Sequence, residues 1–134
     1  MKKFLLATLV LILCAFAAHA EDAPLREFGE GPTGIGVTIV AGDTEDDVAF
    51  VRVHTDKTNL LDALLAVDLI AGENAAWGFN VTTVDGMRAD YEGKGEYWHI
   101  YAYDEEEGDY LLLETGVGST PVADEDLFMF VLNQ

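Results

Sequence analysis

The chain has little cysteine, little serine and few positive charges. Its one cysteine, Cys14, falls within the first twenty residues, so the remainder cannot form an internal disulfide. Seven Lys and Arg residues stand against 25 Asp and Glu residues, and the formal net charge is −18. Such a surface repels phosphate backbones and anionic membranes, so we expect no nucleic-acid partner and no role at a lipid surface.

The scarcity of nucleophiles bears on catalysis. Beyond residue 20 there is one serine, Ser119, and there are two histidines, His54 and His99. Ser119 lies in a Gly-Ser-Thr-Pro-Val stretch, which is typical of a turn rather than of a nucleophile elbow. Carboxylates are so frequent in this chain that a pair of them does not identify a hydrolytic site. We therefore expect a protein that is not an enzyme.

The first twenty residues have the features of a secretory signal peptide. Lys2 and Lys3 precede an apolar run from Phe4 to Phe16, and a pattern of small residues ends at Ala20. The run is shorter than the roughly 20 residues that a membrane-spanning helix requires. We predict that residues 1–20 are cleaved, and that the mature chain is secreted to the periplasm or the exterior without membrane insertion.

The mature chain is long enough for one domain, which we place at residues 37–134. Residues 21–36 contain two prolines and four glycines and are expected to form a flexible leader. The leader includes a literal G-x-G-x-x-G from Gly29 to Gly34. A dinucleotide site needs a strand before this motif and a helix after it, whereas a β-branched run follows here, so we exclude that function.

Hydrophobic periodicity predicts an α+β fold. A helix is expected within residues 58–74, with Asn59 as its N-cap, Gly72 just past its end, and Leu61, Leu64 and Leu65 facing a sheet. Asp85-Gly86 predicts a tight hairpin turn. Strands are expected at residues 37–41, 48–55, 77–84, 87–89, 97–103, 110–114 and 127–132. The order ββαβββ, a mixed sheet packed on a single helix, corresponds to the β-grasp arrangement.

Four stretches of the sequence resemble successive blocks of a known family. These are NLLDALLAVDLI, VTTVDGMRADY, EYWHIYAY and ETGVGSTPVADEDLFMF. Together they are similar to the transcobalamin-C-terminal-like domain, a bacterial secreted module of the soluble-ligand-binding β-grasp superfamily. The resemblance covers about residues 37–132. It departs where the strand after Trp98 runs into four consecutive acids, from Asp104 to Glu107, in place of an Asn-Gly-Glu type of turn.

The resemblance implies a binding module without catalytic activity. Its implied ligand is a soluble, cofactor-like molecule such as cobalamin or another corrinoid, and the chain would need no cofactor of its own. The alternative that the family also implies is a module for protein or cell-surface interaction of the adhesion type. A small-molecule site requires a concave pocket, whereas a protein patch can be flat.

The strand expected at residues 97–103 presents two sets of side chains. Trp98, Ile100 and Ala102 are the apolar set and should face the helix. The opposite set is formed by Tyr97, His99, Tyr101 and Tyr103. These rings could bind a flat ligand or a protein, or they could be ordinary cross-strand packing on a half-exposed sheet. Trp77, Phe79 and Val81 also share one face of their strand, and the sequence alone does not orient that face.

The acidic run from Asp104 to Asp109 contains oxygen ligands of the kind that Ca²⁺ prefers. Calcium loops space their ligands and place glycine to turn the chain, which four consecutive carboxylates do not do. Asp43, Glu45 and Asp47 are spaced alternately, but Val48 stands where an EF-hand requires glycine. We therefore expect a solvated acidic loop and no metal site.

Overall fold

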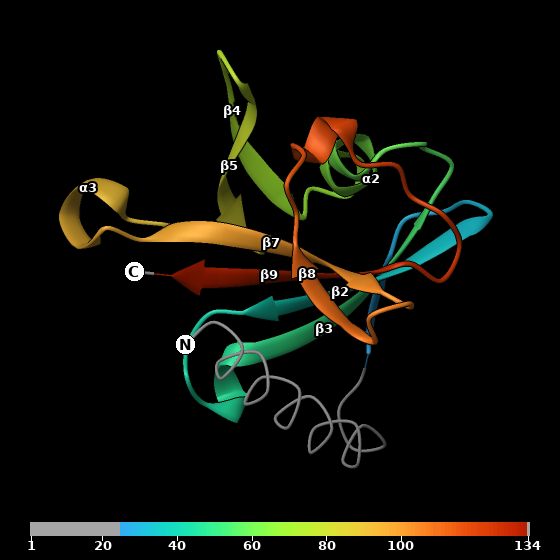
Figure 1. Ribbon diagram of the computed structural model, residues 1–134, viewed down its shortest axis with the longest axis horizontal. Helices are drawn as coiled ribbons and strands as arrows, with labels where there is room; N and C mark the ends of the chain where they lie inside the picture. The colour runs from blue at the N-terminus through green and yellow to red at the C-terminus, as the bar shows by residue number, and fades with distance from the viewer. Residues whose placement is uncertain (1–24, 134) are drawn as a thin grey trace.

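The computed structural model of the protein describes residues 25–133 (Figure 1). The predicted signal peptide and its cleavage after Ala20 lie outside the described residues. Of the expected leader, the described part contains a short strand, β1 (Arg26–Phe28), and the beginning of β2 (Thr33–Val40). Regular structure therefore begins before the boundary expected at residue 37.

A six-stranded mixed sheet forms the main layer, which confirms the α+β class. Its remaining strands are β3 (Val48–Thr55), β7 (Tyr97–Asp104), β8 (Asp109–Leu112) and β9 (Leu127–Asn133), and the order is β1-β3-β2-β9-β7-β8. The central strand β2 is antiparallel to β3 and parallel to β9. The β1–β3 pair is parallel, and the β9–β7 and β7–β8 pairs are antiparallel. The predicted first hairpin is the β2–β3 pair.

Two glycines of the G-x-G-x-x-G stretch have a structural role. Gly29 and Gly31 have φ angles of +80° and +149°. A Cβ at Gly29 would overlap the carbonyl oxygen of His54, and one at Gly31 would overlap the main chain of Thr55. These glycines let the segment between β1 and β2 pass closely over the end of β3, which excludes side chains larger than hydrogen.

Helix α2 (Leu60–Ala66) begins where expected and ends earlier than expected. The Asn59 side chain accepts a hydrogen bond from the N–H of Asp62 at 2.9 Å, so the predicted N-cap is confirmed. Asp68, with φ +56°, takes the left-handed position that the sequence assigned to Gly72. The buried face is formed by Leu60, Ala63 and Leu64. Leu65 was expected to face the sheet, but its side chain is 38% exposed.

A second sheet corrects the expectation of one sheet on a single helix. It contains β4 (Ile70–Ala75), β5 (Gly78–Val84) and β6 (Met87–Arg88), in the order β4-β5-β6. The β5–β6 hairpin turns through Asp85 and Gly86, both with positive φ, as the sequence predicted. A second short helix, α3 (Tyr91–Lys94), and two 3₁₀ turns, η1 (Glu45–Asp47) and η2 (Val117–Ser119), complete the described chain.

Gly72 lies in β4 opposite a bulge in β5, instead of at a helix end. The register between β4 and β5 shifts between Ala71 and Gly72. A Cβ at Gly72 would overlap the carbonyl oxygen of Asn80 in β5. The glycine therefore permits close approach of two strands, and the sequence signal for a helix cap was a false one at this position.

The core lies between the main sheet and the layer that α2, η2 and the second sheet form above it (Figure 1). The completely buried members Ile35, Ile39, Leu60, Leu64, Val84 and Phe130 come from both layers. A smaller cluster on the other face of the main sheet includes Val40, Tyr110 and Met129. Among residues 25–133, no helix is long and apolar enough to cross a membrane.

Candidate functional site

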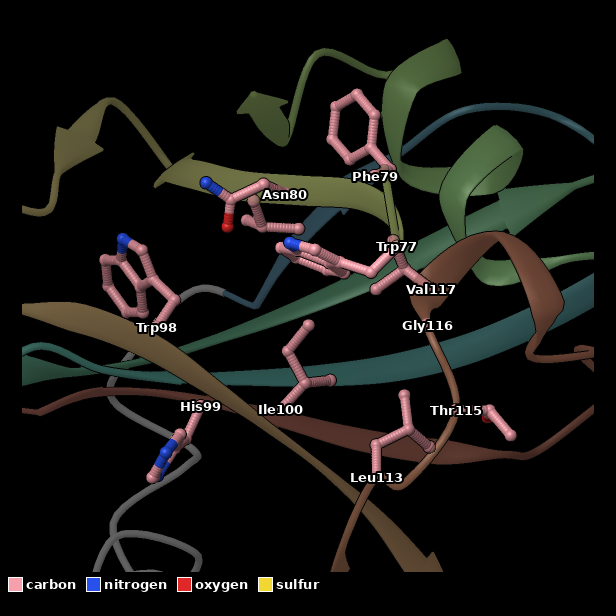
Figure 2. A pocket seen from close by; sticks show the side chains of 11 residues that line it. Trp77, Phe79, Asn80, Trp98, His99, Ile100, Leu113, Thr115, Gly116 and Val117 are labelled. Carbon is pink, nitrogen blue, oxygen red and sulfur yellow. The ribbon is translucent and has the colours of Figure 1, made fainter. Parts of the chain in front are cut away.

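A small cleft lies where β5, β7 and the segment after β8 meet, and its volume is about 160 Å³. Its lining residues are shown in Figure 2: Trp77, Phe79, Asn80, Val81, Trp98, His99, Ile100, Leu113, Thr115, Gly116 and Val117. None of them is an acid, a lysine or an arginine. In so acidic a chain, an uncharged lining is the distinctive feature of this cleft.

The β4–β5 hairpin supplies the most exposed aromatic side chain of the cleft. Ala75 pairs with Gly78, so Trp77 lies in a two-residue turn, and Gly78 closes the turn with φ +133°. The Trp77 side chain is 69% exposed, and its indole lies across the cleft in Figure 2. A large aromatic side chain that the fold leaves in solvent contributes little to the core and is available to a ligand.

Trp98 in β7 forms the floor of the cleft and joins the two sheets. Its indole Nε1–H donates to the carbonyl oxygen of Met87 in β6 at 3.3 Å, and the residue is buried. Ile100, two residues along the same face, is partly buried against the same core. The sequence predicted this inward-facing set, and the packing of Trp98, Ile100 and Ala102 on the core of the helix side confirms it.

The third wall is the segment between β8 and η2, which two hydrogen bonds of Thr120 hold in place. Its hydroxyl donates to the carbonyl oxygen of Gly116 at 2.9 Å and lies 3.1 Å from the hydroxyl of Thr115. Val117, next in the chain, is buried in the main core. This wall is therefore fixed by the hydrogen bonds of Thr120 and by the burial of Val117.

The four predicted binding residues lie on the other face of β7. Tyr97 and Tyr103 are each 40% exposed, and His99 and Tyr101 are partly buried. The ring centroids of Tyr97 and His99 are 4.6 Å apart, and those of His99 and Tyr101 are 6.2 Å apart, both with edge-to-face geometry. Tyr103 makes the same kind of contact with Tyr110 in β8, at 5.3 Å. The structure thus packs Tyr97, His99 and Tyr101 as a row of rings, and Tyr103, on the same face, packs on Tyr110 instead.

Burial affects the chemistry of this row. The pKa of the Tyr101 hydroxyl is raised, mainly by burial and secondly by the neighbouring Tyr97. His99 also borders the cleft, but its imidazole points away from it in Figure 2. The cleft and the row therefore use opposite faces of one strand, and the row stays a prediction.

Sequence reasoning did not assign Trp77 and Phe79 to a site, although it grouped them on one face of their strand. The missing information was the position of the second sheet. Trp98 can dock β6, and β5 can border β7, only because the β4–β5–β6 sheet stacks above the main sheet. No local pattern in the sequence specifies that stacking.

The acidic loop forms a compact turn. One carboxylate oxygen of Asp104 accepts hydrogen bonds from the N–H groups of Glu106 and Glu107, at 2.9 and 3.1 Å. Gly108 closes the turn with φ +65°. Within residues 25–133, no group of three or more His, Cys, Asp or Glu side chains is arranged to hold a metal ion.

The solved structures that are similar to this chain include the following two. A candidate metal-binding protein from Ruminococcus gnavus ATCC 29149 has 30% sequence identity and a TM-score of 0.64, over 77% of this chain and 98% of that one. Haptocorrin in complex with Cbi has 20% identity and a TM-score of 0.51, over 80% of this chain and 26% of haptocorrin. No protein-family model and no curated protein matches the chain.

Proposed function

Because the chain belongs to the same protein family as the Ruminococcus gnavus protein and shares its fold with part of haptocorrin, we propose that it is an exported, non-catalytic binding module. The observation that carries this proposal is the uncharged cleft beneath an exposed Trp77. An exposed tryptophan above an apolar floor provides contact area for a ligand, and His99, the titratable residue of the lining, directs its imidazole away from the cleft.

We place the fold in the β-grasp class and the chain in the transcobalamin-C-terminal-like family. The order β3-β2-β9-β7-β8 around helix α2 supports the first assignment. The likeness to haptocorrin supports the second at the level of the fold. The second sheet, β4-β5-β6, is an addition to that arrangement, and it supplies one wall of the cleft.

A corrinoid is our first candidate ligand, since the haptocorrin structure is a complex with Cbi. A cleft of about 160 Å³ is smaller than the roughly 300–1,000 Å³ of pockets that enclose drug-sized ligands. It would contact one edge of a corrin ring and leave the rest outside. We therefore expect a weak complex, with a Kd of about 10 µM to 1 mM.

Titration of the exported protein with cobinamide and cobalamin tests the ligand. Trp77 and Trp98 are its only tryptophans, so saturable quenching of their fluorescence would report binding. Calorimetry on Trp77→Ala should show affinity weakened about tenfold, the usual cost of removing one central aromatic contact. Tyr91→Ala is the matched control, because Tyr91 is an exposed aromatic residue that does not line the cleft. Absence of saturation below about 1 mM refutes a corrinoid ligand for the isolated module.

The second candidate is a protein or cell-surface partner. The volume of the cleft is comparable to that of the roughly 150 Å³ cavities that hold one benzene ring, so it suits a single apolar side chain. The ring row of Tyr97, His99, Tyr101 and Tyr103 on the other face of β7 could contact either type of partner.

A further inference from the structure

The ladder between β7 and β8 stops beside the cleft. Strand β7 pairs with β9 from Tyr97 to Ala102, but it pairs with β8 only from Tyr101 to Asp104. One further bond, from the N–H of Leu113 to the carbonyl oxygen of Ile100 at 2.8 Å, extends the ladder on the β8 side. Beyond Leu113 the chain leaves the sheet and rises towards η2 (Figure 1).

The hydrogen-bonding direction of Trp98 follows from this geometry. In an antiparallel strand the N–H and C=O of one residue point to the same side, and successive residues alternate. Ile100 directs its carbonyl to the β8 side, so Trp98, two residues earlier, directs its N–H and C=O to that side as well. Within the described part of the chain, no strand pairs with Trp98 there. We name these two main-chain groups the Trp98 edge.

The Trp98 edge and the cleft are adjacent. Trp98, His99 and Ile100 all border the cleft, although the His99 imidazole points away from it. The main chain of β7 must therefore form part of the border. Across the cleft stand Trp77 and Phe79 from the β4–β5 hairpin, and Leu113 marks the point where the chain departs from the sheet after β8. The Trp98 edge thus lies beside an apolar cleft that can hold one side chain.

We propose that an extended segment of a partner protein adds to β7 at the Trp98 edge, antiparallel to it and in line with β8, and inserts one bulky apolar side chain into the cleft. This inference rests on the proposed binding role of the cleft. Strand addition combines main-chain hydrogen bonds, which provide affinity, with a side-chain pocket, which provides specificity. The residue opposite Trp98 projects its side chain to the same face as Trp98, which is the cleft face.

Charge identifies the chemistry of the partner segment. The chain has a formal net charge of −18, and acids flank the site in sequence, Glu96 before β7 and Glu114 after Leu113. Pairing between two copies of this chain would bring like charges together, whereas a basic segment would be attracted. Alternate residues of the added strand would lie on the face of Tyr97, where lysine can contact aromatic rings. The occupant is therefore a basic, alternating, proline-free segment.

The heptapeptide Lys-Val-Lys-Phe-Lys-Val-Lys, acetylated and amidated at its ends, is a suitable probe. It places Val, Phe and Val on the cleft face and Lys on the other. N-methylation of the Val and Phe residues removes the N–H groups that would point at β7. N-methylation of the second, third and fourth Lys residues removes only N–H groups that would point away from β7. Both patterns add three methyl groups and remove three N–H groups, so they change the size and polarity of the peptide equally. The two methylated peptides are therefore matched controls for each other.

Titration of the ¹⁵N-labelled exported protein, followed by NMR, measures binding and locates it. We expect the Trp98 amide to shift and to exchange more slowly with solvent. Methylation at Val and Phe should weaken binding at least tenfold, and methylation at Lys should change it less than about twofold. Exchanging Phe for Ala in the peptide, or Trp77→Ala in the protein, should weaken binding about fivefold to tenfold. Tyr91→Ala should leave it unchanged.

Three results would overturn strand addition at this edge. They are no binding of the heptapeptide at 5 mM, equal effects of the two methylation patterns, and shifts confined to β1 at the opposite edge of the sheet. The corrinoid titration separates this inference from the proposed ligand. If cobinamide binds saturably and the heptapeptide does not bind, strand addition is refuted and the proposed binding function stands. The converse result refutes the corrinoid and supports strand addition.

Discussion

Replacing Leu64 with alanine tests which face of helix α2 holds the fold together. The Leu64 side chain is completely buried between the helix and the main sheet, whereas the Leu65 side chain is 38% exposed. Leu65→Ala is a matched control, because it makes the same chemical change one residue away in the same helix. Alanine is also a slightly better helix former than leucine, so helix propensity does not favour the wild type at either position.

The expected magnitudes are well separated. Removing a buried leucine side chain costs about 2–5 kcal/mol, because the transfer free energy is lost and a cavity remains. Helix α2 is covered by η2 and borders β3 and β4, so the site has little freedom to collapse, and we expect about 3–4 kcal/mol for Leu64→Ala. For Leu65→Ala we expect less than about 1 kcal/mol, since much of that side chain is already in water.

Urea unfolding followed by far-ultraviolet circular dichroism measures both values. With a slope of about 1.5 kcal/mol per molar urea, the Leu64→Ala midpoint should fall by about 2–2.7 M and the Leu65→Ala midpoint by less than about 0.7 M. The slopes should stay the same as in the wild type. An equal or larger loss for Leu65→Ala would refute the burial pattern described above and would support the predicted face, which contained Leu65 as well as Leu64.

Two further predictions concern the second sheet and the cluster on the other face of the main sheet. Gly72→Ala should destabilise the protein by about 3 kcal/mol, because the added Cβ would overlap the main chain of β5. Gly86→Ala is the control: its Cβ would meet no atom within 4 Å, and the positive φ alone should cost about 1 kcal/mol. Comparable losses of stability for the two variants in urea unfolding would contradict the close approach of β4 and β5. Burial raises the pKa of Tyr110, a hydrogen bond with Thr38 opposes the rise, and Tyr103 adds to it. The folded-state pKa thus lies above the unfolded value of about 10, so this contribution to stability is complete below about pH 10 and is lost as the pH rises through the folded-state pKa. Tyr110→Phe should therefore lose less stability than the wild type between about pH 9 and 11, and identical losses would refute the effect.

Local signals in the sequence were reliable where one residue controls one turn or one strand. Asn59 caps its helix, Asp85-Gly86 turns its hairpin, and the alternation around Trp98 separates the two faces of β7 correctly. Each of these features depends on neighbours within a few residues. The helix end was predicted wrongly because a glycine has two uses: Gly72 fits a left-handed cap, and it also fits the position opposite a bulge where two strands approach closely.

The candidate site was only partly accessible to sequence reasoning. The tyrosines and His99 stood out as a group because they alternate along one strand, and they do form a row. The cleft collects side chains from three separate segments, around Trp77, Trp98 and Leu113. Their meeting depends on how the β4–β5–β6 sheet stacks on the main sheet, and such long-range packing leaves no periodic trace.

The α+β class, the two hairpins, the N-cap of the helix and the strongly acidic composition could all be recognised from the amino-acid sequence, because composition and short-range stereochemistry decide these properties. The packing of the folded chain was needed to show that residues 70–88 form a separate sheet, that Leu65 is partly exposed although Leu64 faces the core as predicted, and that Trp77 covers a cleft beside the Trp98 edge. These features arise from contacts between residues far apart in the chain, and their geometry is set by packing rather than by local preference.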